Sequence, residues 1–149
     1  MKVSLELKGM KEVEKEVMKI AGKTKEVRQE IAESSLKIQK KAKERLVDYK
    51  AVDTGHLRNS IIVEFAFNGD HAEIGPTAPY GPYVEYGTRP HFPPPDALEH
   101  WARHHGFESA WPICKIIAKR GLKARPYLMP SYEEVKDKFF ENLKKVFMR

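Results

Sequence analysis

The 149-residue chain is long enough for one hydrophobic core, and we expect a single domain over residues 1–149. Apolar residues make up 41% of it and charged residues 32%, which is typical of a soluble globular protein. Neither a membrane span nor a signal peptide is expected, because no apolar run is long enough and "MKVSLELKGMKEVEKE" contains no apolar core. The single cysteine, Cys114, excludes an intrachain disulfide and a cysteine-based zinc site, which fits synthesis in a reducing, intracellular compartment.

The net charge of +6 is unevenly distributed. Residues 1–50 carry 14 Lys and Arg against 9 Asp and Glu, residues 51–114 carry 3 against 8, and residues 115–149 carry 10 against 4. A basic chain suggests nucleic-acid binding, but most of the positive charge alternates with glutamate in helix-like segments, as on an ordinary solvated helix face. An acidic middle between basic ends also suits copies of the chain that meet with opposite potentials.

The N-terminal third predicts a short strand and then one long helix. In "KVSLELKG" the apolar residues alternate with charged ones, and Gly9 ends the strand. A helical pattern follows from about Met10 to Val47, and such a helix would be over ~50 Å long. It therefore either breaks near Gly22 or projects beyond the core. Its stripe is Val13, Val17, Ile20, Thr24, Val27, Ile31, Ser34 and Ile38.

The middle of the chain predicts a helical turn and a β-hairpin. Asp53 or Thr54 is expected to cap the turn, and Gly55 allows close backbone approach. In "SIIVEFAFNGDHAEIG" the strands are joined by Asn68-Gly69, a favoured tight turn. The side chains expected on one face are Ile61, Val63, Phe65 and Phe67.

Three helices are predicted after the hairpin. "PDALEHWARHHG" has Asp96 as its N-cap, with Glu99 three residues later, and "SAWPICKIIAKRG" ends at Gly121. After the extended "ARPYLMP", the last helix opens with Ser131 and Glu134 as a capping box. Its inward side is expected to be Tyr132, Val135, Phe139, Leu143 and Val146. The fold class is therefore α+β, a small antiparallel sheet packed against a long N-terminal helix, with short helices and a C-terminal helix.

Catalytic and metal motifs are weak. "DTG" at residues 53–55 is the aspartic-protease triplet, but that chemistry needs a dimer and a preceding strand, where this chain has a helix end. His100 and His104 share a helix face without an HExxH motif or a third ligand, and the helix dipole accounts for the cationic Arg103, His104 and His105. We expect no enzyme, metal or cofactor.

The stretch "YGPYVEYGTRPHFPPPD" at residues 80–96 combines prolines, which fix φ, with the tyrosines and arginine that protein interfaces favour. Two interpretations stay open: a contact between subunits, or an internal brace in which Glu85 pairs with Arg125. A third use is sequence-tolerant nucleic-acid binding, in which these tyrosines stack on bases. Its charges would come from Arg58, Arg89, Arg120, Lys123 and Arg125.

Three motifs in order resemble the gene-product-ten-like family of tailed bacteriophages: "VDTGHLRNSI" before the hairpin, "YGPYVEYGT" after it, and "KARPYLMPSYEE" near the end. They span about Val52 to Glu134, "HFPPPDALEHWARHHG" also looks like an insertion of some members, and the N-terminal helix contributes little. The resemblance implies a structural protein of tail completion or head–tail joining, with no catalytic residues.

It also implies partners among phage structural proteins, namely a connector, a tail terminator or a tail tube, with a homo-oligomeric ring as one arrangement. The expected location is the virion tail or neck, after assembly in the host cytoplasm, with no membrane contact. The candidate interface or structural residues are Asp53, Thr54, Gly55, Leu57, Arg58, Tyr80, Tyr83, Glu85, Tyr86, Gly87, Arg89, Arg125, Pro126 and Tyr127.

Overall fold

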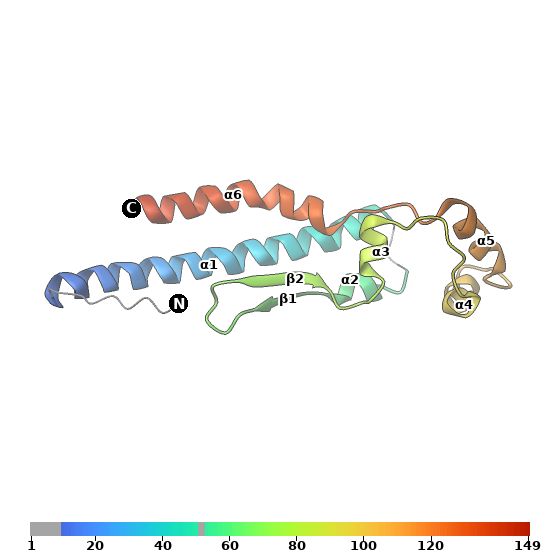
Figure 1. The fold of residues 1–149 in the computed structure, drawn as a ribbon, viewed down its shortest axis with the longest axis horizontal. Coiled ribbons are helices and arrows are strands. Elements are labelled where there is room, and N and C mark those ends of the chain that lie inside the picture. The colour runs from blue at the N-terminus through green and yellow to red at the C-terminus, as the bar shows by residue number, and fades with distance from the viewer. Residues whose placement is uncertain (1–9, 51–52) are drawn as a thin grey trace, which may run out of the picture.

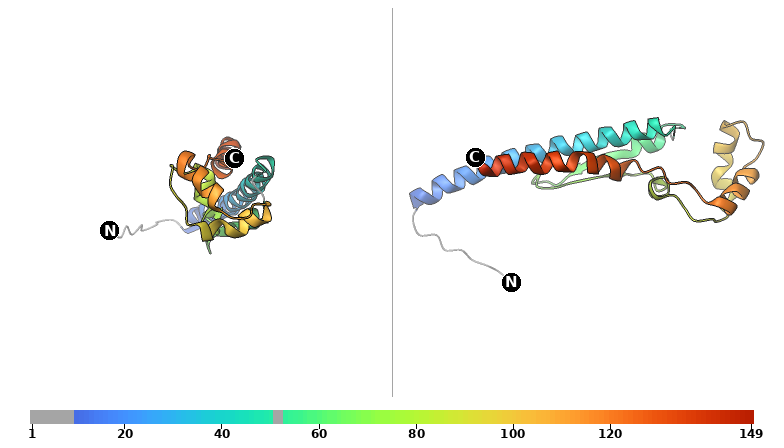
Figure 2. Two further views of the ribbon diagram at one scale, coloured as in Figure 1. Left: turned by 90° about the vertical axis from the view of Figure 1, so that its right-hand side faces the viewer. Right: turned by 90° about the horizontal axis from the view of Figure 1, so that it is seen from above.

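The computed structural model describes residues 10–50 and 53–149, so the strand predicted at residues 3–8 lies outside the described part. The molecule is elongated: two long helices and a hairpin lie side by side, and two short helices form one end (Figures 1 and 2). The predicted α+β class is confirmed. The elements are α1 (Met10–Asp48), α2 (His56–Ser60), β1 (Ile61–Phe65), β2 (Ala72–Pro76), α3 (Gly81–Tyr86), α4 (Pro95–His104), α5 (Trp111–Arg120) and α6 (Leu128–Met148).

Helix α1 continues unbroken through Gly22 and projects beyond the core, the second of the two predicted outcomes. A Cβ at Gly22 would meet no atom within 4 Å, so no packed neighbour bends the helix there. Lys23 Nζ donates to the Phe147 carbonyl at 3.2 Å, which places the end of α6 opposite this turn. The N-terminal part of α1 runs on past that end (Figure 1), and Met18 and Ile20 are exposed.

Helices α1 and α6 run antiparallel and bury the stripes predicted for them over their central parts. On α1 the buried stripe includes Ile38 and continues to Ala42 and Leu46. On α6 it centres on Val135, whereas Tyr132 is 42% exposed instead of facing inward. Burial of these apolar surfaces is the main force that holds the two helices together. At the edge of the contact Glu134 forms ion pairs with Lys41 and Arg45.

The hairpin pairs Ile61 with Pro76, Val63 with Ile74 and Phe65 with Ala72. The prediction of a tight turn at Asn68-Gly69 is wrong. Ala66 N donates to the His71 carbonyl at 3.1 Å, so residues 67–70 form a longer loop. Ile61 is fully buried, but Phe65 is 47% exposed and Phe67 lies entirely in solvent. At this tip the side chain of Arg28 on α1 lies beside Gly69.

Three helices begin differently from their predictions. Gly55, and not Asp53 or Thr54, is the N-cap of α2, although Thr54 Oγ1 accepts a long hydrogen bond of 3.4 Å from the His56 N–H at the start of the helix. Helix α4 begins at Pro95, so Asp96 lies in its first turn instead of at the N-cap, and Glu99 binds Arg103 and the Ala110 backbone N–H. Helix α6 begins at Leu128, before the predicted capping box at Ser131. In α6 a carboxylate from a distant part of the chain replaces the local cap.

Candidate interface and structural site

The Glu85 carboxylate joins α3 to the start of α6. Its side chain is 5% exposed. Oε2 accepts hydrogen bonds from the backbone N–H groups of Tyr127 at 2.7 Å and Leu128 at 2.8 Å, and Oε1 accepts one from Met129 at 2.9 Å. A carboxylate in this position satisfies the unpaired donors of a helix N-terminus and complements its dipole.

The sequence "YLMP" completes this cap. Tyr127 is the N-cap of α6, and Leu128 and Met129 are its first two residues. The third helical residue is Pro130, which has no N–H to satisfy. Each of the four backbone positions from the N-cap Tyr127 to Pro130 therefore either donates to Glu85 or has no donor.

Tyr127 is buried beneath the cap, with 1% of its surface exposed, in a core that includes Leu46, Leu57 and Ile61. Its hydroxyl donates to the Gly81 carbonyl at 3.3 Å. Burial, with the Glu85 charge as the second cause, raises the pKa of Tyr127 to about 12. The phenol therefore stays neutral in the folded protein at ordinary pH.

The Glu85–Arg125 ion pair proposed for the brace is wrong. Arg125 contributes its backbone, whose N–H donates to the Val84 carbonyl at 2.8 Å, and its side chain is exposed. Glu85 instead accepts hydrogen bonds from the backbone N–H groups of Tyr127, Leu128 and Met129, shortly after Arg125 in the chain. The two motifs do meet, but through main-chain hydrogen bonds, which a residue pattern does not display. Pro126 lies half-buried between them.

Beyond α3 two chain segments cross at very close range. Thr88 and Leu122 form a β-bridge. A Cβ at Gly87 (φ 70°) would lie 2.5 Å from the Leu122 carbonyl oxygen. A Cβ at Gly121 (φ 71°) would lie 2.1 Å from the carbonyl oxygen of Thr88. Both positions therefore need glycine, for the left-handed backbone and for the close approach.

The tyrosines of this region lie outside the core: Tyr80 is 41% exposed, Tyr83 58% and Tyr86 72%. Helix α3 thus directs Glu85 inward and Tyr83 and Tyr86 outward within six residues. Tyr80 lies against His56, with its hydroxyl 3.0 Å from Nδ1. Burial, followed by the charge of Asp53, raises the pKa of Tyr80.

The "DTGHLR" segment therefore adjoins Tyr80. Leu57 is buried in the core with Tyr127, whereas Arg58 is half-buried and lies near Gly55. Thr54 and Arg89 are exposed, Thr54 just before α2 and Arg89 just past the chain crossing. The structure thus gathers most candidate residues around α3, from two sides, and leaves Arg89 toward the far end.

Two features were missed in the sequence. Aromatic side chains cluster on α4, α5 and their loops. The ring centroid of Trp101 lies 4.0 Å from that of His105 and 6.3 Å from that of Phe107, and both pairs are stacked. The ring centroids of Phe92 and Trp111 lie 5.6 Å apart. The four-residue spacing of Trp101 and His105 could have revealed the first pair.

The second missed feature joins α4 to the loop before α2. Asp53 Oδ1 lies 2.8 Å from His104 Nδ1 and 3.6 Å from His105 Nε2. Their side-chain ligand atoms lie within 4.8 Å of one another, so this group could hold a metal ion. The two histidines are adjacent, but nothing in the sequence links them to Asp53.

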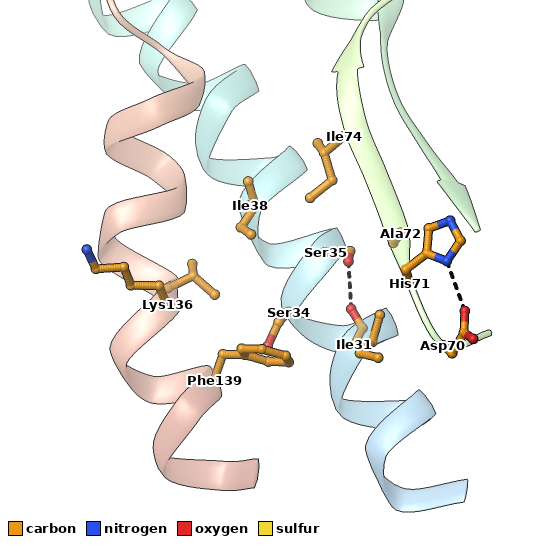
Figure 3. A pocket seen from close by; sticks show the side chains of 11 residues that line it. Ile31, Ser34, Ser35, Ile38, Asp70, His71, Ala72, Ile74, Lys136 and Phe139 are labelled. Carbon is orange, nitrogen blue, oxygen red and sulfur yellow. Dashed lines mark hydrogen bonds and ion pairs between the residues drawn. The ribbon is translucent and has the colours of Figure 1, made fainter. Parts of the chain in front are cut away.

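A shallow groove of about 270 Å³ lies between α1, α6 and β2 (Figure 3). Apolar side chains, including Ile31, Ile74 and Phe139, line much of it. The serine hydroxyls beside it are satisfied, since Ser34 donates to Glu30 and Ser35 to the Ile31 carbonyl. No unpaired serine hydroxyl is left to orient a ligand there.

Residues 7–87, more than half of the chain, match the family described as "Bacteriophage HK97-gp10, putative tail-component". No curated protein and no solved structure shows significant similarity to the chain. Within residues 10–50 and 53–149, no helix has both the length and the apolar content to cross a membrane.

Proposed function

The chain belongs to the HK97 gp10-like family of bacteriophage tail components, and we propose that it acts without catalysis, as a structural protein that completes the tail or joins it to the head. The observation that carries the proposal is that α3 buries one side chain against α6 and exposes others to solvent. Glu85 fixes this helix to α6, and the tyrosines on either side of Glu85 are left in solvent.

We call Tyr80, Tyr83, Tyr86 and Arg125 the α3 surface. Tyrosine and arginine are enriched where protein partners bury each other, and tyrosine supplies a large contact area with few rotatable bonds. The backbone beneath is already held by Glu85 and by the Arg125–Val84 hydrogen bond. A surface fixed in advance loses little conformational entropy on docking.

The partners that fit are other phage structural proteins (a connector, a tail terminator or a tail tube) and further copies of the chain in a ring. A ring needs two different patches on each copy. The acidic residues 51–114, which include most of the α3 surface, and the basic residues 115–149 supply opposite charges for such a contact.

The experiment is a Tyr83→Ala/Tyr86→Ala double variant supplied to a phage that lacks this gene. Both side chains are exposed, so the free energy of unfolding should change by less than about 1 kcal/mol. We expect tailed particles, counted by electron microscopy, to fall at least about tenfold, as when hot-spot side chains are removed. Arg125→Ala should act in the same direction.

Phe147→Ala on α6 is the matched control, because Phe147 is an aromatic residue that is 60% exposed and lies near the opposite end of α6 from the Glu85 cap. It should leave particle numbers unchanged. Normal assembly of the double variant and of Arg125→Ala would place the contact elsewhere, and unfolding of the double variant would assign its tyrosines to the internal brace.

Sequence-tolerant nucleic-acid binding is the second candidate, because the same exposed tyrosines beside Arg125 could stack on bases. It predicts DNA binding that weakens steeply as salt is raised and is lost in the double variant. DNA binding that the double variant retains would exclude the α3 surface as the site.

A further inference from the structure

Asp53, His104 and His105 form a second polar cluster, beside the α3 surface, since the charge of Asp53 acts on Tyr80. Asp53 comes from the loop that precedes α2, and the two histidines come from the end of α4. All three residues are exposed, so the cluster is accessible from solvent.

The orientation of His105 suits a cation between its Nε2 and Asp53. Its Nδ1 lies 2.9 Å from the Trp101 carbonyl oxygen, which can only accept, so Nδ1 carries the hydrogen. In the neutral imidazole Nε2 then has a lone pair, and it faces the Asp53 carboxylate oxygen at 3.6 Å. Two acceptors in this position repel unless a proton or a metal ion lies between them.

The surroundings of His105 also match those of a metal ligand. A ligating histidine commonly donates its other N–H to a backbone carbonyl, which fixes the tautomer and the ring orientation. Here the carbonyl belongs to Trp101, and the Trp101 indole stacks on the His105 ring at 4.0 Å. The ring is thus held with Nε2 toward Asp53.

We propose that Asp53 Oδ1, His104 Nδ1 and His105 Nε2 bind one divalent transition-metal ion of the Zn²⁺ type. Two imidazoles and a carboxylate are ligands that Zn²⁺ accepts, and water would take the fourth position. Ligand atoms on a tetrahedron with Zn–N and Zn–O bonds of ~2.0–2.1 Å lie ~3.3 Å apart. The observed separations of 2.8 and 3.6 Å from Asp53 bracket that value.

The ion would act as a clamp between two parts of the molecule. Residues 88–121, which contain α4 and α5, leave the rest of the fold at the Thr88–Leu122 crossing. A metal bound by Asp53 and α4 would add a second attachment. It differs from the His100–His104 pair considered in the sequence, since His104 acts with its neighbour and a distant carboxylate and His100 does not contribute.

The test is a Zn²⁺ titration of the full chain, with any affinity tag removed, against a chromophoric chelator. We expect one Zn²⁺ per chain and a rise in Tm on saturation. Loss of a ligand in Asp53→Asn or His105→Gln should raise the Zn²⁺ dissociation constant by about tenfold or more, at least the effect of losing a supporting hydrogen bond.

His100→Gln is the matched control, because it removes an exposed histidine from the same helix and should leave the dissociation constant unchanged. Absence of stoichiometric Zn²⁺ binding would overturn the proposal. So would an Asp53→Asn variant that binds like the parent while His100→Gln does not, since that places the ion on His100 and His104.

A measurement on the unmodified chain removes any dependence on how the variants fold. Substoichiometric Mn²⁺ or Co²⁺ should broaden the NMR signals of His104 and His105 before those of His56, His71, His91 and His100. Equal broadening of all six histidines would mean non-specific binding and would contradict the site.

Discussion

The two ends of the molecule are built differently. The body, formed by α1, α2, the hairpin, α3 and α6, buries large side chains such as Leu46, Ile61 and Tyr127 almost completely. The distal end, residues 88–121 with α4 and α5, has a core of Ala102, Ala110 and Cys114, against which the partly buried Leu98 and Ile113 pack, and Ile117 is buried on α5. Its large aromatics remain outside: Trp101 is 38% exposed, Phe107 44% and Trp111 55%.

Burial of apolar area stabilises by roughly 25 cal/mol per Å². The fully buried side chains of the distal core are small, so they contribute less than the fully buried leucine, isoleucine and tyrosine of the body. The distal end depends more on how its two connecting segments cross at Gly87 and Gly121. We infer that the body is stabilised by packing under one polar cap and the distal end by backbone geometry.

The largest effect should come from removing the cap in the body. Glu85→Ala leaves three backbone N–H groups without their acceptor, so we expect the free energy of unfolding to fall by about 3–5 kcal/mol. Glu85→Gln should cost less, because its amide oxygen still accepts. Urea denaturation measures both. Glu108→Ala, an exposed carboxylate of the distal end, is the control, and an equal cost for Glu85→Ala and Glu108→Ala would contradict the role of the cap.

The next effect concerns the crossing of the connecting segments. Gly121→Ala adds backbone strain and a clash with the Thr88 carbonyl, and should cost about 3 kcal/mol or more. Gly106 (φ 81°) has open space around it, so Gly106→Ala carries only the strain of about 1 kcal/mol. Limited proteolysis should cut residues 88–121 first in Gly121→Ala. Similar unfolding free energies for the two variants would show that the close approach is not needed.

The smallest effect concerns the Tyr127 hydroxyl. Tyr127→Phe removes one long hydrogen bond and should cost about 1 kcal/mol at neutral pH. The pKa of this phenol is raised from 10 to about 12 in the folded state, so between those values the unfolded chain loses a proton that the folded chain keeps. Its contribution is thus complete below pH 10 and is lost as the pH rises toward 12.

A spectrophotometric titration checks this prediction. The last tyrosine to ionise in the parent should do so near pH 12, and that step should be missing from Tyr127→Phe. The stability of the variant should also decline less between pH 10 and pH 12. A late step that persists in the variant would belong to another tyrosine.

The sequence predicted most of the elements because their signals are local. Apolar periodicity indicated α1 and α6, and alternation indicated the hairpin. The helix starts were less predictable. Ser131 with Glu134, and Asp96 with Glu99, both have capping-box spacing, yet Glu134 pairs with α1 and Glu99 with the residues after α4. A local pattern cannot show that a distant group competes for the same role.

The sequence predicted which residues come together at the candidate site better than it predicted how they bind one another. The motifs around Glu85 and Tyr127 do meet, but the expected charge pair is replaced by backbone donors, which every residue except proline carries. Asp53 and the adjacent histidines meet only because the fold brings α4 beside the loop before α2. Such contacts depend on tertiary structure, so no regular spacing of residues in the sequence reveals them.

The Glu85 cap also has a mechanical consequence. A pull applied to Tyr83 or Tyr86 passes through the backbone of α3 and the three hydrogen bonds of Glu85 into α6. The 21 residues of that helix extend ~30 Å along α1, to a point beside Lys23. Force applied at α3 is therefore transmitted along the body to the far end of α6 by a stiff helix, without first deforming the hairpin.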